Sequence, residues 1–195
     1  KVRSAGFDPE QFEWIGDPEP PNFDEENEGV VVGLYDTLDS LEQTIEFLWL
    51  WMAEGHTNNS RWPEFKTDPK HLRDFRDPEH KGWRPRTRRW VKIDLSANRG
   101  KSSEWTRKNV EHAQIAGLEV MAAMAQHPKA MAARDGSNKP YLNVTALDFN
   151  WGRDGRPWQG LPCVRFRHDS GEVKLLVGWV GGWHSRWSCP VLLRE

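Results

Sequence analysis

The order of the predicted elements indicates an α+β fold, in which two main helices pack on one face of a mostly antiparallel sheet. Three observations carry this prediction: two units of a strand followed by a helix come first, a run of strands follows, and the turns between those strands have hairpin composition. A chain of 195 residues can bury one core, so we expect a single domain over residues 29–195. Residues 1–28 are predicted to be an extended acidic arm, because four prolines interrupt any helix there.

The first strand-and-helix unit spans residues 30–53. Residues 30–34 are a continuous apolar run, which is typical of a strand buried on both faces. Asp36 or Thr37 is predicted to cap a helix that runs to about residue 53 and stops at Gly55. The apolar positions of this helix recur at steps of three and four and therefore share one face: Leu38, Leu41, Ile45, Leu48 and Met52.

The second unit follows a long irregular stretch. Residues 55–89 contain four prolines and are predicted to form a long basic loop, and a connection of this length in a compact domain is usually functional or mobile. Residues 90–95 alternate between apolar and polar side chains and predict a strand. Ser102 or Ser103 then caps a predicted helix of about 23 residues, which is expected at the centre of the core because its second half is apolar nearly all round.

The last third of the chain is predicted to be antiparallel sheet. Segments rich in β-formers are 141–149, 161–167 and 172–180, and a final short strand is expected at 191–193. The links 153–156 and 168–171 have the composition of hairpin turns. Alternation along 172–180 places Trp179 on the same face as Val173 and Leu175, so we expect Trp179 to be buried.

Charge is distributed unevenly, although the net charge is only −2. Residues 1–60 carry 14 acidic and 2 basic side chains, whereas residues 61–195 carry 25 basic and 15 acidic ones. Such asymmetry indicates an acidic tail, a basic binding surface, or one folded against the other.

Bulk composition also bears on location. No apolar run approaches the roughly 18 residues that a membrane span needs, and two cysteines are too few for a disulfide framework. The sequence holds 17 Arg against 10 Lys and only 4 Ile, a bias expected of a high-GC bacterium or a phage that infects one. We therefore expect no membrane association and a cytoplasmic protein, or a virion protein if the chain is phage-encoded.

The strongest functional signal is residues 81–92, in which six basic residues and no acid accompany two tryptophans. Arginine matches phosphate geometry and indole rings stack on unpaired bases, so this segment predicts contact with a nucleic-acid backbone and limited sequence readout. The predicted contact residues are Lys81, Trp83, Arg84, Arg86, Arg88, Arg89, Trp90 and Lys92. A rival interpretation pairs these arginines with the acidic arm or with the acidic helix 36–54 of the same chain.

A second signal is Asp148 on one predicted strand and Glu172 with Lys174 on another. An Asp followed by Glu-x-Lys on neighbouring strands resembles the signature of metal-dependent nucleases. The resemblance implies that the two carboxylates hold a hard divalent cation and that the lysine stabilises the attacking water or the phosphate. The sequence departs from that family because Glu172 directly follows a turn and the helix order differs, and the sequence favours surface residues at hairpin ends.

A third signal is a Gly-Lys-Ser between a predicted strand and a predicted helix. A P-loop would need a glycine where this chain has Leu95, so that fingerprint is not met. A helix N-terminus with polar side chains nearby still predicts a general anion site, formed by Arg99, Lys101, Ser102 and Ser103. The histidines show no metal-ligand spacing and Cys163 is expected to be a buried structural thiol, so no metal, cofactor or catalytic residue is predicted.

Tryptophan is concentrated at the end of the chain, where the last 45 residues hold five of the twelve. If these side chains are exposed, they could stack on sugars or bind a protein partner. If they are buried, they would fill a thin core. Gly181 and Gly182 predict a bend before a loop whose candidates for exposure are Trp183, His184 and Trp187.

The sequence favours a non-enzymatic binding protein that acts in a protein or nucleoprotein assembly. Its expected partners are a protein partner and nucleic acid, the latter through residues 81–92. Two alternatives remain, namely a structural or assembly protein of a phage particle and a metal-dependent phosphodiesterase.

Overall fold

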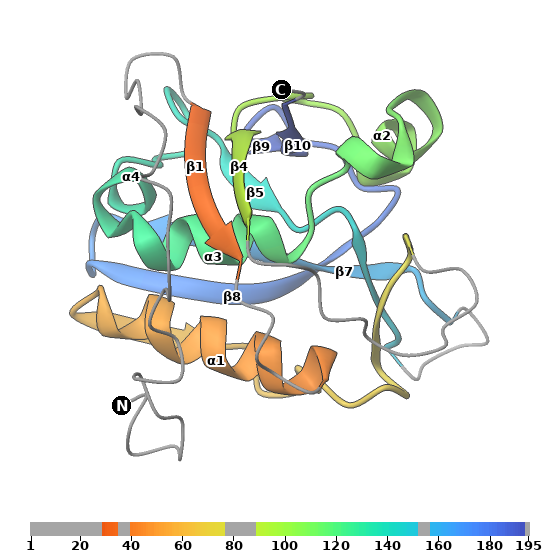
Figure 1. Ribbon diagram of the computed structural model, residues 1–195. Coiled ribbons are helices and arrows are strands. Elements are labelled where there is room, and N and C mark those ends of the chain that lie inside the picture. The colour runs from red at the N-terminus through yellow and green to blue at the C-terminus, as the bar shows by residue number, and fades with distance from the viewer. Residues whose placement is uncertain (1–28, 35–39, 77–88, 152–156, 194–195) are drawn as a thin grey trace.

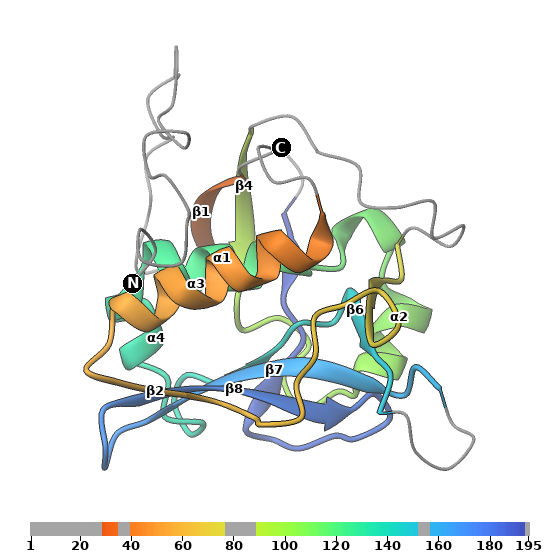
Figure 2. The ribbon, with the colours of Figure 1, turned by 90° about the horizontal axis from the view of Figure 1, so that it is seen from below.

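The computed structural model describes residues 29–34, 40–76, 89–151 and 157–193, with backbone only at 29–34 and 89–90. These residues form an α+β fold, as the sequence predicts. The helices are α1 (Leu41–Glu54), α2 (Ser103–Asn109), α3 (Leu118–Gln126) and α4 (Pro128–Ala132). Figures 1 and 2 show three layers, in which α3 lies between a small sheet on one side and a larger sheet on the other.

The small sheet is antiparallel and has the order β1-β4-β10. Its strands are β1 (Gly29–Leu34), β4 (Arg89–Asp94) and β10 (Val191–Leu192). The predicted strands at 30–34 and 90–95 are therefore both present, but they pair with each other rather than with the strands of the last third. The segment 191–193 joins them from the far end of the chain.

The larger sheet has the order β2-β8-β7-β5-β9, and β6 joins β3 to β7. Its strands are β2 (Asn58–Arg61), β3 (Leu72–Asp74), β5 (Tyr141–Asn143), β6 (Leu147–Phe149), β7 (Gly160–Arg167), β8 (Glu172–Trp179) and β9 (Trp187–Ser188). β2 runs parallel to β8 and β5 runs parallel to β9, and the other pairs are antiparallel. The predicted 55–89 loop thus contains two strands, and the predicted 141–149 strand is divided into two.

Helix α1 follows the predicted pattern but starts later. Ser40 caps it, because the Ser40 hydroxyl accepts a hydrogen bond from the Gln43 backbone N–H at 3.1 Å. Asp36 and Thr37, the predicted caps, lie outside the described residues. Gly55 ends the helix as predicted, and the apolar face is buried at Ile45, Leu48 and Met52.

The predicted 23-residue helix is broken into α2, a 3-10 turn (His112–Gln114) and α3. Tertiary hydrogen bonds take the place of helical ones in the break. Ile115 forms a β-bridge with Val191, the Ala116 backbone N–H donates to the Pro190 carbonyl at 3.2 Å, and the Ile115 carbonyl accepts from Arg76. These partners lie far away in the sequence, so local periodicity could not reveal the break.

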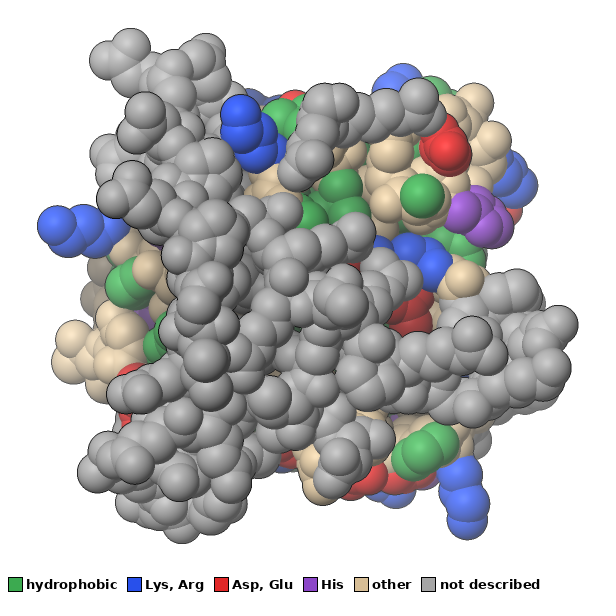
Figure 3. All heavy atoms as spheres, viewed as in Figure 1, with side chains coloured by type: hydrophobic (Ala, Val, Ile, Leu, Met, Phe, Trp, Pro, Cys, Tyr) green, Lys and Arg blue, Asp and Glu red, His purple; other side chains and the backbone are tan. Residues whose placement is uncertain are grey.

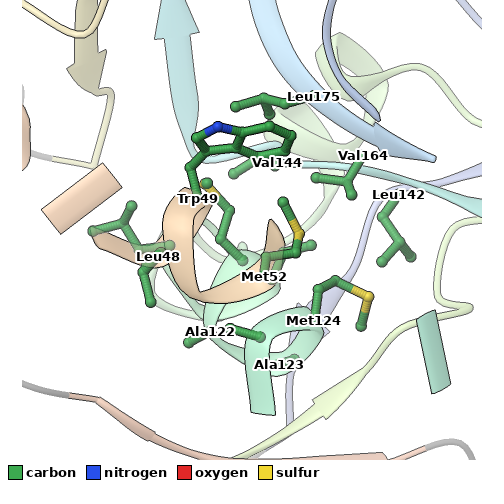
Figure 4. Packing of buried hydrophobic residues seen from close by; sticks show 14 of the residues in the cluster. Leu48, Trp49, Met52, Ala122, Ala123, Met124, Leu142, Val144, Val164 and Leu175 are labelled. Carbon is green, nitrogen blue, oxygen red and sulfur yellow. The ribbon is translucent and has the colours of Figure 1, made fainter. Parts of the chain in front are cut away.

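The core lies between α1, α3 and the larger sheet. Figure 4 shows Trp49 and Met52 of α1 against Met124 of α3 and the strand residues Val164 and Leu175. All five side chains are buried, with Trp49 the most exposed at 7%. Burial of each large apolar side chain contributes about 1.5–3 kcal/mol, so this layer is the main source of stability.

The predicted hairpin turn at residues 168–171 is confirmed. The β7–β8 turn contains Gly171 at φ +60°, a left-handed conformation that glycine adopts without strain. The other predicted turn, 153–156, lies outside the described residues. Within the described ranges, no helix has the length and apolar character needed to cross a bilayer.

Candidate functional site

Exposed tryptophans lie where α2 meets the end of β8. Trp179 is 60% exposed, Trp183 is 74% exposed and Trp105 is 38% exposed. The prediction that Trp179 is buried is therefore wrong. Trp179 pairs with Gly160 at the last step of the β7–β8 ladder, and a Cβ on Gly160 would lie 2.6 Å from Nε1 of Trp151. The Trp151 indole thus fills the space over Gly160, and Trp179 stays outside the core.

Backbone hydrogen bonds hold this corner in place. The Glu104 N–H donates to the Val180 carbonyl, and the Gly182 N–H donates to the Trp179 carbonyl, both at 2.9 Å. A Cβ on Gly181 would lie 3.1 Å from Cζ2 of Trp179, so glycine lets the indole pack on the turn. The start of α2 is therefore joined to the β8–β9 turn by a backbone hydrogen bond.

Basic side chains lie on the same two segments as these rings. Lys101 Nζ lies 5.0 Å from the centroid of a Trp105 ring, and the exposed Lys108 pairs with Glu104 at 2.7 Å. Figure 3 shows basic, acidic, histidine and hydrophobic side chains interspersed over α2. We define the tryptophan corner as the exposed tryptophans and the exposed Lys, Arg and His side chains of α2, of the residue before its cap and of the β8–β9 turn: Trp105, Trp179, Trp183, Lys101, Lys108, His184 and Arg186.

The predicted anion-site residues mostly make internal contacts. The Arg99 guanidinium donates to three backbone carbonyls, those of Ser137, Asn138 and Ser185. Ser102 caps α2 by accepting from the Trp105 N–H at 3.0 Å, and Ser103 is buried against Thr145 and Cys189. Of the four predicted residues, Lys101 alone joins the exposed tryptophan corner, so this arrangement does not favour an anion site at the start of α2.

The nuclease-like residues are not brought together. Asp148 is 3% exposed and accepts from Arg73 Nε at 3.0 Å and from Arg107 Nη1 at 2.6 Å. β6 meets β7 at Gly160, whereas Glu172 pairs with Arg167 at the other end of that strand. Seven strand steps of about 3.3 Å separate those two positions, about 23 Å in all.

Glu172 and Lys174 form their own contact, with Nζ 3.1 Å from Oε2. A hydrogen bond from the Ser60 hydroxyl, followed by the charge of Lys174, lowers the pKa of Glu172. Asp148 is buried, so the favoured sequence interpretation of a surface residue at a hairpin end is wrong for it. No cluster of three His, Cys, Asp or Glu side chains able to hold a metal occurs in the part of the chain that the structure describes.

Cys163 is a buried thiol, as expected. Burial raises the pKa of Cys163 to about 12, and its Sγ donates to Oδ1 of Asn143 at 3.3 Å. A thiol with so high a pKa stays protonated at neutral pH and is a poor nucleophile. Its Sγ packs against β8, where a Cβ on Gly178 would lie 2.8 Å from it.

Most of the basic segment 81–92 lies outside the described residues, namely Lys81, Trp83, Arg84, Arg86 and Arg88. Arg89, Trp90 and Lys92 belong to β4, where Lys92 is exposed and pairs in register with Val31. The described residues therefore show where this segment ends, on the central strand of the small sheet.

Sequence reasoning missed Trp105, Lys108 and Arg186 as surface residues of the tryptophan corner. The sequence could have indicated the position of Trp105, because Lys101 lies four residues before it at the start of the predicted helix, and residues at this spacing are neighbours. The contact between α2 and the β8–β9 turn depends on a backbone hydrogen bond between residues 76 positions apart, Glu104 and Val180. No local sequence pattern predicts this contact. Comparison of the chain with protein-family models, curated proteins and solved structures found no match.

Proposed function

We propose that this chain is a non-enzymatic binding protein of a protein or nucleoprotein assembly and that nucleic acid is one of its ligands. It would act in the cytoplasm, or in a virion if the chain is phage-encoded. The observation that carries the proposal is the tryptophan corner, where the exposed indoles of Trp105, Trp179 and Trp183 share two adjoining segments with Lys101, Lys108 and Arg186, and Lys101 lies over the Trp105 ring.

Exposed tryptophans with cations beside them suit single strands. Unpaired bases stack on indole rings whatever their sequence, and nearby cations neutralise the phosphates. Trp179 and Trp183 are 60% and 74% exposed, so they are far more exposed than core residues are. The basic segment 81–92 adds six cations and two further tryptophans and would supply phosphate contacts.

The double variant Trp179→Ala/Trp183→Ala tests the stacking role. Loss of stacking is worth about 1–3 kcal/mol per base, so affinity for a labelled single-stranded oligonucleotide should fall about 5-fold to 150-fold for each ring lost. Fluorescence anisotropy at fixed salt measures it. The thermal unfolding midpoint should change little, because both rings lie outside the core.

The matched control is Leu193→Ala, which removes another exposed apolar side chain beyond β10 in the small sheet. This variant should bind as the parent does. Equal affinity in the double variant and the parent would show that the tryptophan corner does not contact the strand.

A further inference from the structure

Strand register brings polar and aromatic side chains into one row across the larger sheet. Ser60 pairs with Lys174, and Lys174 pairs with Arg165. Continuing the β5–β7 register by one residue places Tyr141 beside Arg165, and Tyr141 pairs with Trp187. We define the sheet row as these five residues, one each from β2, β8, β7, β5 and β9.

The sheet row lies on the face away from α1 and α3. Val164 and Leu175, the neighbours of Arg165 and Lys174, are in the core beneath these helices. Side chains alternate along a strand, so Arg165 and Lys174 point the other way. Arg61, next to Ser60 on β2, pairs with Glu46 of α1 at 2.6 Å and therefore points toward the helices. Ser60 then lies on the opposite face, with Arg165 and Lys174. In Figure 2, α1 and α3 lie on one side of β7 and β8.

Two aromatic rings form one end of the sheet row. The Tyr141 and Trp187 ring centroids lie 5.3 Å apart at 59°. Gly136, at φ +75°, holds the Tyr141 ring so closely that a Cβ there would lie 2.7 Å from Cε2 of the ring. The Trp187 carbonyl accepts from the Gly100 N–H at 2.9 Å. Both residues are half-buried and held in fixed positions.

Among the described residues, no acidic side chain pairs with Arg165, the second cation of this row. Lys174 pairs with Glu172, and the neighbouring Arg167 pairs with Asp169 at 2.6 Å. By contrast, Nε of Arg165 is buried with no hydrogen-bond acceptor, and no described carboxylate lies within 4.0 Å of its guanidinium. No described carboxylate therefore neutralises the charge of this guanidinium, which favours an anionic ligand over the row.

We propose that the sheet row binds single-stranded nucleic acid, with a phosphate accepting from Arg165 and bases stacking on Tyr141 and Trp187. The inference rests on the proposed function and names a second surface for it. The row from Lys174 to Trp187 spans three strand spacings, about 14 Å, and a sheet face of this kind stacks two or three bases. Trp187 lies four residues after Trp183, so a strand on this row can continue toward the tryptophan corner.

Charge and ring chemistry together favour nucleic acid over an acidic peptide. An anion of either kind would satisfy Arg165, but an acidic peptide offers no planar groups for the two rings. The probe is therefore a labelled oligothymidylate of about 15 nucleotides, with polyglutamate of similar length as competitor.

The test compares three variants of the full chain. Arg165→Met keeps the aliphatic stem and removes the donor, Arg165→Lys keeps the charge, and Lys66→Met removes one exposed charge from the β2–β3 connection. Arg165→Met should weaken oligothymidylate binding by about tenfold or more and lower the salt slope by about 0.7. Arg165→Lys should recover part of the affinity, and Lys66→Met should stay within about twofold of the parent. Thermal melts establish that each variant is folded.

The outcomes separate this inference from the proposed function. If the parent binds and depends on Trp179 and Trp183, but Arg165→Met behaves like Lys66→Met, the sheet row is not a binding surface and the proposed function stands. Competition by polyglutamate at equal concentration would also overturn the inference, because it would show a general anion surface. A parent that binds no oligonucleotide at low salt overturns both.

Discussion

Replacing Arg76 with methionine is expected to lower the free energy of unfolding by about 3–5 kcal/mol, because it leaves buried carboxylates without their cation. Arg76 Nη2 lies 2.6 Å from Asp74 Oδ2, Nη1 lies 3.1 Å from Glu119 Oε1, and the three side chains are at most 9% exposed. Arg76 also donates to the Ile115 carbonyl at 3.0 Å and so holds the break between α2 and α3. Urea denaturation of the parent and the variant measures the loss.

The pH dependence of the same variant gives an independent check. Burial raises the pKa of Glu119, but the charge of Arg76 and hydrogen bonds from backbone N–H groups outweigh it and lower the pKa below its usual 4.5. The parent therefore keeps this stabilisation above pH 4.5 and loses it as the pH falls through the folded-state pKa. Removing Arg76 removes the largest cause that lowers the pKa of Glu119, so the variant should lose less stability than the parent as the pH falls below 4.5.

An exposed ion pair provides the control for Arg76. Lys108 pairs with Glu104 at 2.7 Å, but both side chains are more than half exposed. Lys108→Met should leave the urea midpoint unchanged within error, because water already solvates both charges. A loss for Arg76→Met as small as that of Lys108→Met would contradict the role assigned to the buried cluster.

Asp148→Asn is expected to lower the free energy of unfolding by about 2–3 kcal/mol. The substitution keeps the shape of the side chain and removes the charge that Arg73 and Arg107 share. The expected loss is smaller than for Arg76→Met, because Arg107 keeps its hydrogen bonds to the Thr145 and Leu147 carbonyls and its place over the Phe75 ring at 4.4 Å. Urea denaturation measures the difference.

The matched control for Asp148 is Asp169→Asn, which breaks the exposed pair with Arg167 and should have no measurable effect. Plasmid incubated with Mg²⁺ distinguishes the structural role from the nuclease interpretation. Cleavage by the parent that is lost in an equally stable Asp148→Asn variant would favour the nuclease. A destabilised variant without any cleavage difference supports the structural role of the Arg73–Asp148–Arg107 contact.

Elements that depend on local pattern were predictable from the sequence. The apolar face of α1, its end at Gly55 and the β7–β8 hairpin all follow from periodicity and turn chemistry within about 20 residues. The start of α1 was predicted too early, because Asp36 and Thr37 are cap-forming residue types just before the apolar pattern, whereas the Ser40 hydroxyl accepts from the Gln43 N–H.

Features that depend on distant partners were not predictable. Asp148 is buried because Arg73 and Arg107 reach it, from 75 and 41 residues away. Trp179 is exposed, and the space over its ladder partner Gly160 is filled by Trp151, which is far away in the sequence from Trp179. The sheet row needs the parallel pairing of β2 with β8 and of β5 with β9, which no alternation pattern reveals. The sequence indicates Trp183, His184 and Lys101 as surface candidates, and all three are exposed, whereas Trp105, Lys108, Arg186 and the sheet row emerged only with the structure.

The central claim, binding of nucleic acid, is tested most directly by measuring the affinity for a labelled single-stranded oligonucleotide against salt. The parent chain and the variant with Arg84, Arg86, Arg88 and Arg89 changed to alanine should be compared between about 50 and 200 mM salt. The account predicts steeply salt-dependent binding by the parent, and in the variant a weaker affinity with a slope of log K against log salt reduced by up to about 3. Absence of binding by the parent at low salt, or identical curves for the two proteins, would contradict it.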